Sequence, residues 1–290
     1  MDKVDLNMLS AIAEKKNVTR AAEYLCIAQS SLSYRLKRLE NEFNANLLIR
    51  TPRGVIFTPE GESLLQCVRN IQEQLRKTKE SIQNMKGTIQ GELRIAVTAA
   101  FARYELPDIL KNFLKLYPQV EVFLKTSQSH NVYRMLQKGE VSIAIIRGDH
   151  PWLEEKRLIA TEPICLVSGS PLEICDLPNR PQIIHPLSGV HNIAETWWRQ
   201  NFASPPYTSM EVDNMDIGLQ MVLRDLGWAI IPVIGLKGYT SLYTKGLTWK
   251  NGNPLVRKTW LMCRNSSLEL SVVQAFVEYV NDCVNVGDKN

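Results

Sequence analysis

The sequence has 290 residues, with 34 Lys and Arg against 30 Asp and Glu, and with six Cys and four His. A chain of this length commonly forms two domains, each with its own core. No run approaches the roughly 20 apolar residues of a membrane span, and the charged N-terminus does not match a secretory signal, so we expect a cytoplasmic protein with no membrane partner. The cysteines show no CxxC and no zinc-like spacing with the histidines, so we expect reduced thiols and no metal.

The positive charge is confined to one part of the chain. Residues 1–90 hold 14 Lys and Arg against 10 Asp and Glu, whereas residues 91–290 hold 20 of each. The whole surplus of four positive charges therefore lies in the first third. This distribution predicts a basic module followed by a larger neutral domain.

The basic module begins with a pattern of short helices. Apolar residues at helical spacing predict a first helix that ends near residues 15–17. Thr19 is expected to cap a short second helix, with Val18 as a hydrophobic staple just outside it. A three-residue break at 26–28 precedes a third helix. Its buried stripe is predicted to comprise Leu32, Leu36, Leu39 and Phe43.

The opposite face of the third helix carries amide, hydroxyl and cationic side chains. Such a face on the second helix of a helix-turn-helix is typical of DNA reading, because short polar groups reach base edges while cations neutralise phosphates. Two apolar runs that flank residues 50–54 predict a hairpin wing whose Arg53 lies along a minor groove. An ordinary solvated helix face is the alternative. The predicted DNA-contacting residues are Gln29, Ser30, Ser31, Ser33, Tyr34, Arg35, Lys37, Arg38, Arg50 and Arg53.

Residues 5–61 resemble the winged helix-turn-helix of the LysR-type transcriptional regulators. The matching segments are 18–25, Gln29, 32–33, 36–40, 47–54 and 58–61. Three positions depart from the family: Ala28 stands where a capping Ser or Thr is usual, Ser30 replaces a frequent Pro, and Tyr34 replaces a frequently basic residue. The resemblance implies the family's docking mode on double-stranded DNA, and the base preference is not carried over.

Residues 59–88 are predicted to form a linker helix that starts at the Thr58–Pro59 pair. Its apolar positions alternate steps of four and three, a heptad seam with one polar interruption at Thr78. This period favours a partner helix, and packing on its own domain is the alternative. In the family this segment pairs two subunits, and a dimer would read an inverted repeat. The predicted dimerisation residues are Leu64, Val68, Ile71, Leu75 and Ile82.

Strands and helices alternate through residues 91–290, which predicts βαβ units and a mostly parallel sheet. The alternation restarts after residue 161, so we expect two lobes, lobe I at about 91–161 and 266–290 and lobe II at about 162–265. Segments 91–95, 139–145 and 226–232 resemble the family's effector domain, which is similar to periplasmic solute-binding proteins. The predicted fold class is α+β multidomain: a winged helix-turn-helix (1–58), a linker helix (59–88) and a two-lobed α/β effector domain (91–290).

Open α/β sheets bind ligands at the carboxyl ends of their strands, where helix N-termini offer N–H groups to anions. In the family, small hydroxyl residues at such places often hold an effector carboxylate. The effector is therefore expected to be an organic anion. Each candidate is alternatively a turn or cap residue. The predicted effector contacts are Thr98, Ser127, Ser129, Arg147 and Ser188.

The sequence contains no GxSxG, GxGxxG, phosphate-loop lysine or HExxH motif, so we expect neither an enzyme nor a cofactor. The leading hypothesis is a sequence-specific transcriptional regulator, a homodimer or homotetramer, whose neutral domain senses a small metabolite. Sensing would alter DNA bending and promoter activity, with RNA polymerase as a further partner. The alternatives are an effector-independent repressor or architectural protein, and an enzyme with a DNA tether.

Overall fold

The computed structural model describes residues 1–52, 54–84, 88–186 and 189–287. The chain folds into two compact units, one formed by Met1–Thr88 and the other by most of the chain from Ile89 onward. Among the described residues, no helix is both long and apolar enough to cross a membrane.

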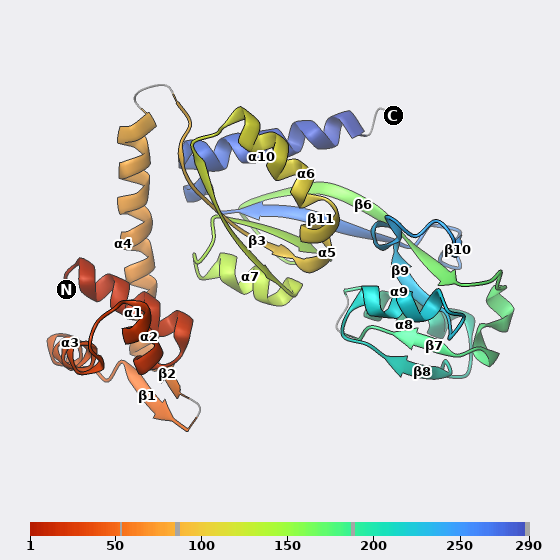
Figure 1. The fold of residues 1–290 in the computed structure, drawn as a ribbon, viewed down its shortest axis with the longest axis horizontal. Helices are drawn as coiled ribbons and strands as arrows, with labels where there is room; N and C mark the ends of the chain where they lie inside the picture. The colour runs from red at the N-terminus through yellow and green to blue at the C-terminus, as the bar shows by residue number, and fades with distance from the viewer. Residues whose placement is uncertain (53, 85–87, 187–188, 288–290) are drawn as a thin grey trace. The chain divides into compact units, whose positions relative to one another are not determined.

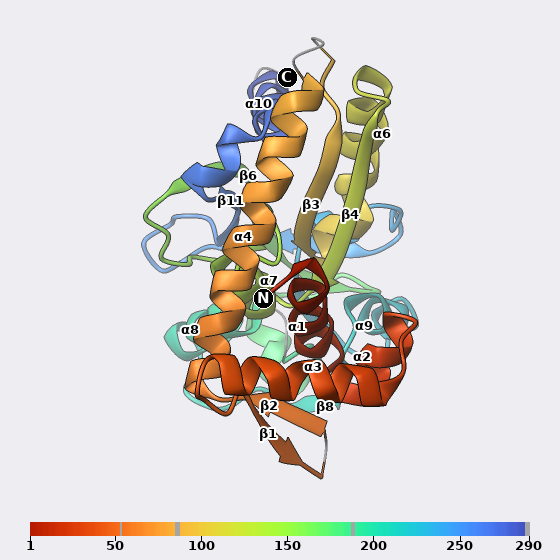
Figure 2. The ribbon, with the colours of Figure 1, turned by 90° about the vertical axis from the view of Figure 1, so that its left-hand side faces the viewer.

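The N-terminal unit combines short helices, a hairpin and one long helix (Figure 1). Its elements are α1 (Lys3–Lys15), α2 (Val18–Tyr24), α3 (Gln29–Glu42), β1 (Leu48–Thr51), β2 (Gly54–Phe57) and α4 (Pro59–Asn84). β1 and β2 pair antiparallel, in register from Leu48 opposite Phe57 to Thr51 opposite Gly54. Figure 2 shows this hairpin extending away from the helices, as a wing does.

Local hydrogen bonds set the starts of these helices. The carboxylate of Asp2 caps α1, accepting two N–H groups of the first turn at 2.8 and 2.9 Å. Asn17 caps α2, accepting the N–H of Thr19 at 2.9 Å. The prediction that Thr19 is this cap is wrong, because Thr19 already lies inside α2 and Asn17 offers its carbonyl first. α3 starts after Ala28, whose methyl group makes no capping bond.

One apolar core joins the helices of the N-terminal unit. Its buried residues include Met8, Leu9, Ile12, Ala21, Leu32, Leu36, Leu39, Leu47 and Leu65. Phe43, predicted to complete the buried stripe of α3, is 46% exposed. The reason is its position at the C-cap, where the chain has already left the helical path.

The first turns of α4 belong to this same core. Leu64 and Val68 are buried in it, at 8% and 0% exposure, and Ile71 packs against it. The prediction that Leu64 and Val68 pair two subunits is therefore wrong, because the start of α4 covers α1 of its own chain. Leu75 and Ile82, further along the same helix, are 58% and 60% exposed.

The second unit alternates strands and helices twice. The first series comprises β3 (Gly91–Thr98), α5 (Ala99–Tyr104), α6 (Leu106–Leu116), β4 (Val120–Ser127), α7 (Ser129–Gln137) and β5 (Ile143–Arg147). The second comprises β6 (Glu155–Ser168), β7 (Gln182–Ile184), α8 (His191–Asn201), β8 (Thr208–Glu211), α9 (Met215–Val222), β9 (Ala229–Pro232), β10 (Tyr243–Gly246), β11 (Val256–Cys263) and α10 (Ser271–Gly287).

The main sheet has the strand order β10-β6-β11-β5-β3-β4, and β9 also pairs with β6. β3 is parallel to β4 and β5. In contrast, β11 is antiparallel to β5 and β6, and β9 and β10 are antiparallel to β6. The prediction of a mostly parallel sheet is therefore wrong for the half that contains β6, β9, β10 and β11. In that half, β6 carries the chain out of the first series and β11 returns it in the opposite direction.

The first series, together with α10 from the end of the second, forms a three-layer lobe, called lobe I below. Along β5, Ile143 and Ile145 pack with α6 and α10, whereas Ala144 and Ile146 pack with α7. Successive strand residues point to opposite faces, so this alternation places helices on both sides of the sheet. Figure 1 shows α6 and α10 on one side and α7 on the other.

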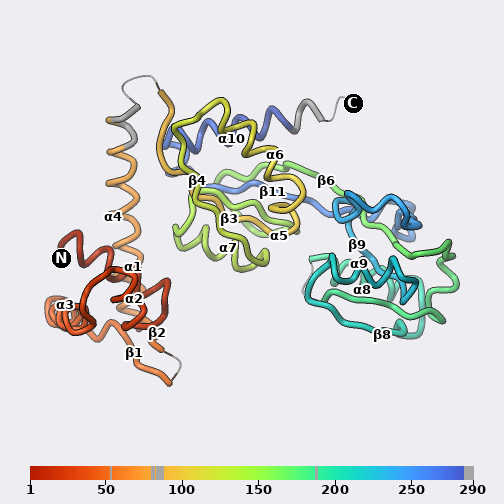
Figure 3. Tube along the Cα trace, viewed as in Figure 1, coloured from red at the N-terminus to blue at the C-terminus, as the bar shows by residue number. Residues whose placement is uncertain are grey.

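The second series forms lobe II around the end of β6. Ile164 and Leu166 pack with Trp197 and Trp198 of α8, whereas Cys165 and Val167 belong to the cluster around α9. β6 therefore contributes to the cores of both lobes, and Figure 3 traces β6 and β11 passing between them. These two strands are called the crossing strands below.

Gly61 offers a test of how α4 joins the N-terminal unit. A Cβ at this position would lie 2.1 Å from the carbonyl oxygen of Leu47, which is backbone and cannot rotate away. Gly61→Ala should therefore destabilise this unit by about 1–3 kcal/mol, the usual cost of overpacking. All six Trp lie in the second unit. In urea unfolding, circular dichroism should thus show a transition at lower urea concentration. Trp fluorescence should show an unchanged transition.

The matched control is Gly246→Ala, where an added Cβ meets open space. It should leave both transitions in place. An unchanged circular dichroism transition in Gly61→Ala would contradict the close packing of α4 on Leu47.

Candidate functional site

The exposed face of α3 carries most of the side chains that the sequence predicts to contact DNA. The exposed members are Gln29, Ser30, Ser31, Tyr34, Lys37 and Arg38. Tyr34 is 73% exposed, although it is a large aromatic residue. Ser33 is half-buried, and its hydroxyl accepts a hydrogen bond from Gln29 Nε2 at 3.3 Å. This face therefore presents amide, hydroxyl and aromatic groups with the cations Lys37 and Arg38.

Arg35 and Arg38 bind instead to the start of α1. Arg35 Nη1 donates to Asp5 Oδ1 at 2.9 Å and to Asp2 Oδ2 at 3.1 Å, and Arg38 Nη2 donates to Asp5 Oδ2 at 2.5 Å. Asp5 is fully buried, and a buried carboxylate requires such partners. The N–H of Asp5, and then Arg35, lower the pKa of Asp2 to about 2. Both arginines thus hold α3 on α1, a role that the sequence prediction missed.

Two further predicted DNA contacts belong to the wing. Arg50 lies on β1 and is exposed. Arg53 is outside the described residues, as is Ser188 among the predicted effector contacts. On the described part of α3 and the wing, Lys37 and Arg50 are therefore the predicted contacts whose charges have no ion-pair partner.

Lys37 and Arg35 should differ when each is replaced. Lys37→Ala should make the slope of log K against log salt shallower by about 0.9, because one phosphate contact is lost. Arg35→Met should instead lower the stability of the N-terminal unit, because the buried carboxylate of Asp5 loses a hydrogen-bond donor. The measurements are DNA binding over a salt series and urea unfolding followed by circular dichroism. A reduced slope and unchanged stability in Arg35→Met would contradict the role of its bond to Asp5.

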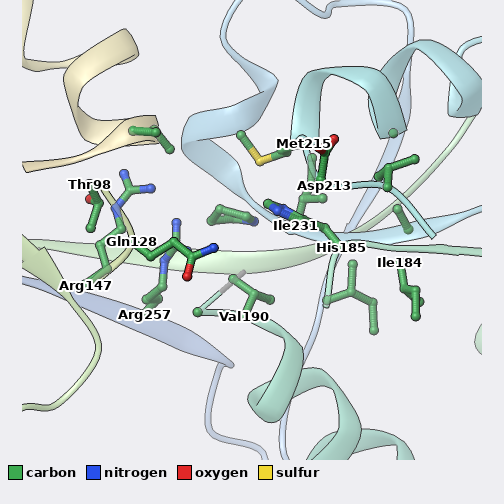
Figure 4. A pocket seen from close by; sticks show the side chains of 18 of the residues that line it. Thr98, Gln128, Arg147, Ile184, His185, Val190, Asp213, Met215, Ile231 and Arg257 are labelled. Carbon is green, nitrogen blue, oxygen red and sulfur yellow. The ribbon is translucent and has the colours of Figure 1, made fainter. Parts of the chain in front are cut away.

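The second unit contains a cavity of about 220 Å³ between its lobes. Lobe I contributes the ends of β3, β4 and β5, and lobe II contributes β7, β9, the start of α9 and the residues before α8. Figure 4 shows the lining side chains, with Thr98, Gln128, Arg147 and Arg257 gathered at one end. His185, Asp213 and Met215 lie toward the other end.

Four predicted effector contacts line this cavity together: Thr98, Ser127, Ser129 and Arg147. Thr98 is 7% exposed, and its Oγ1 has no hydrogen-bond partner within the described ranges. It precedes α5 but makes no side-chain capping bond, so the alternative role as a cap does not account for it. Ser127 accepts a hydrogen bond from Asn131 Nδ2 at 3.1 Å.

Arg147 lies in a buried cluster with Arg257 and Glu162. Arg147 Nη2 is 3.0 Å from Glu162 Oε1, and Arg257 Nη2 is 3.3 Å from Glu162 Oε2. Burial, and then the charge of Arg257, lower the pKa of Arg147 to about 10, and burial lowers the pKa of Arg257. Arginine is effectively always protonated in proteins, so both guanidinium groups remain charged at neutral pH.

The sequence analysis missed Arg257 and Glu162. Arg257 stands opposite Glu162 in the β11–β6 ladder, and Thr259, two residues on, stands opposite Arg147 in the β11–β5 ladder. Directly paired residues share a face of the sheet, so the three charged groups meet. Only the pairing of β11 between β5 and β6 brings them together, and no local sequence signal reports that pairing.

Polar contacts also join the lobes beside the cavity. Arg103 Nη1 and Tyr104 Oη of α5 donate to Asp216 of α9 at 2.6 and 2.7 Å. Lys237 Nζ donates to Glu105 Oε1 at 2.7 Å. Burial, and then the bond to Asp216, raise the pKa of Tyr104, which keeps its hydroxyl protonated. The ion pairs are largely exposed, and such pairs contribute about 0–1 kcal/mol each, so they hold the lobes only weakly.

Comparison with known proteins identifies the family. The model of the bacterial regulatory helix-turn-helix proteins of the lysR family matches residues 4–62, and the model of the LysR substrate binding domain matches residues 86–283. The chain belongs to the LysR family: it is a DNA-binding transcriptional regulator with an effector-binding domain.

Relatives and solved structures match along almost the whole chain. The uncharacterized transcriptional regulators YraN and YkuM of Bacillus subtilis (strain 168) are 36% identical over 281 residues and 31% identical over 284 residues. Both alignments cover 97% of each chain. A full-length OxyR variant from Pseudomonas aeruginosa has a TM-score of 0.71 at 17% identity, covering 97% of this chain and 94% of the other. CbnR in complex with its target DNA has a TM-score of 0.65 at 18% identity, covering 97% and 99%.

Proposed function

We propose that this regulator is controlled by a small organic anion that binds between the lobes of its second unit. The observation that carries the proposal is the buried polar end of the cavity. There, Thr98 Oγ1 and the Nε groups of Arg147 and Arg257 have no hydrogen-bond partner in the described part of the chain. Buried polar groups are normally paired, so these atoms are suited to a ligand carboxylate.

The DNA-binding half of the proposal rests on α3 and the wing. Gln29, Ser33 and Tyr34 read base edges in the major groove, while Lys37 and Arg50 contact phosphates. Arg53, outside the described residues, is proposed to lie along the minor groove. One such helix covers only a few base pairs, so two copies on an inverted repeat give the required specificity.

A homo-oligomer supplies these two copies. Leu75 and Ile82 are a heptad apart on α4, and both are exposed, which suits them to pairing with a second linker helix. Whether the assembly is a dimer or a tetramer, the reading helices move with the linkers. We place the protein in the cytoplasm with its DNA, with RNA polymerase as a further partner and with no catalytic role.

Ligand binding acts through the arrangement of the lobes. A ligand shifts a conformational equilibrium only when it binds the two arrangements with different affinities. The cavity is lined by both lobes, and the Arg103–Asp216 and Lys237–Glu105 pairs that join them are weak. A carboxylate bound to both lobes therefore favours one arrangement, which changes the spacing of the reading helices and the bend of the DNA.

Thr98→Val tests the ligand half. The change removes one hydroxyl and nearly conserves volume, so it should weaken binding of the effector about tenfold, the value of one lost hydrogen bond. The experiment is selection of bound DNA fragments with and without a panel of organic acids, followed by titration of the active acid monitored by thermal unfolding.

Thr208→Val is the control, because Thr208 is exposed on β8 and does not line the cavity. It should bind the effector as the unmodified protein does. If no organic acid changes either the bound DNA or the unfolding temperature, the protein acts without an anionic effector and the proposal fails.

A further inference from the structure

The cationic end of the cavity contains its own counter-ion. Each oxygen of Glu162 faces one arginine, Oε1 at 3.0 Å from Arg147 and Oε2 at 3.3 Å from Arg257. Thr259 Oγ1 also donates to Oε1, at 3.4 Å. Arg147 and Arg257 line the cavity, whereas Glu162 does not, so the carboxylate lies behind the two guanidinium groups.

The charges in this cluster do not cancel. Two guanidinium groups share one carboxylate, which leaves one positive charge among residues that are 3%, 5% and 8% exposed. A charge in such surroundings requires a partner of opposite sign. Arg147 Nε, Arg257 Nε and Thr98 Oγ1, all from residues that line the cavity, have no hydrogen-bond partner within the described ranges. The site is therefore matched to a single ligand carboxylate.

Among the described lining residues, the other end of the cavity offers no second cation. Its lining within the described ranges is mainly apolar, with Ile183, Ile184, Val190, Leu219 and Ile231. Burial lowers the pKa of His185 below its ordinary 6.5, so its imidazole is neutral at pH 7. Asp213 is the charged residue there, and it is acidic. A second ligand carboxylate at this end would meet apolar surface and a like charge.

We propose that Glu162 sets the number of negative charges that the cavity accepts. By neutralising one of two arginines, it makes the site selective for monocarboxylates with an apolar body over dicarboxylates of the same length. Glu162 is thus a specificity-determining residue that acts through Arg147 and Arg257. This inference rests on the proposed function and names the chemical class of its effector.

A set of charge variants tests the proposal in the full-length protein. The cluster has net charge +1 in the unmodified protein, +2 in Glu162→Gln and 0 in Arg257→Gln. The double variant, which carries both substitutions, has net charge +1 again, although the Glu162 carboxylate and the Arg257 guanidinium are both absent. The probes are two matched pairs, butyrate with succinate and valerate with glutarate, together with the neutral amide valeramide. Calorimetric titration gives each affinity, and Trp fluorescence reports the fold of the second unit.

The unmodified protein should bind each monocarboxylate about tenfold or more tightly than its dicarboxylate, because the second charge is left without a partner. Glu162→Gln should bring this ratio close to one or invert it. Arg257→Gln should bind valerate no better than valeramide. The double variant should regain the preference for the monocarboxylate.

If Glu162→Gln fails to fold, the double variant still tests the proposal, because its cluster has the same net charge as that of the unmodified protein. Its preference for the monocarboxylate then has to differ from that of Arg257→Gln. Dicarboxylates that bind the unmodified protein as tightly as monocarboxylates would overturn the charge proposal and leave anion sensing standing. An unchanged ratio of monocarboxylate to dicarboxylate affinity in Glu162→Gln would also overturn the charge proposal and leave anion sensing standing. If none of the acids binds and a wider panel of organic acids also has no effect, the proposed function fails together with this inference.

Discussion

The architecture of the second unit depends on the backbone ladder between the crossing strands. β6 contributes to the cores of both lobes, and β11 pairs with it from Val256 opposite Pro163 to Cys263 opposite Glu155. The lobes are therefore joined by a shared sheet, and not by a free linker. A change in their arrangement has to bend or twist this ladder, which already contains an irregularity between Thr259 and Trp260. The position of the cavity and of its buried charges follows from this one constraint.

The same charge motif occurs in both units with opposite consequences. In each, two arginines share one buried carboxylate: Arg35 and Arg38 share Asp5, and Arg147 and Arg257 share Glu162. Beside α3, Asp2 adds a second acid, so the two carboxylates balance the two arginines and the cluster serves to hold two helices together. Between the lobes the arginines are buried, so the remaining charge needs an anion. Under the proposed function, the first cluster is structural because its charges balance, whereas the buried second cluster binds a ligand.

Local sequence patterns predicted the helices, the wing and four cavity residues, because each depends on neighbours in the chain. The four cavity residues lie where a strand ends or a helix begins: Thr98, Ser127, Ser129 and Arg147. The order of the elements in the sequence indicates these places, because ligands bind at the carboxyl ends of strands. Arg257 and Glu162 could not be found this way, since only the antiparallel insertion of β11 brings them to Arg147. The first part of the α4 seam, Leu64 and Val68, was misassigned because a heptad pattern does not tell whether a helix packs on its own chain or on another.

The placement of the charged cluster connects ligand chemistry with the crossing strands. Arg257 and Glu162 are direct partners in the β6–β11 ladder, and Arg147 stands beside them at the end of β5. A carboxylate that accepts from the Nε groups of both arginines, while Glu162 faces their Nη2 groups, would bind residues of the strands that join the lobes. The apolar lining contributes affinity in proportion to buried area, but it lies in the wall of lobe II and not on this ladder. Under the proposed function, the body of the effector therefore governs how tightly it binds, whereas its charge governs whether the lobes respond.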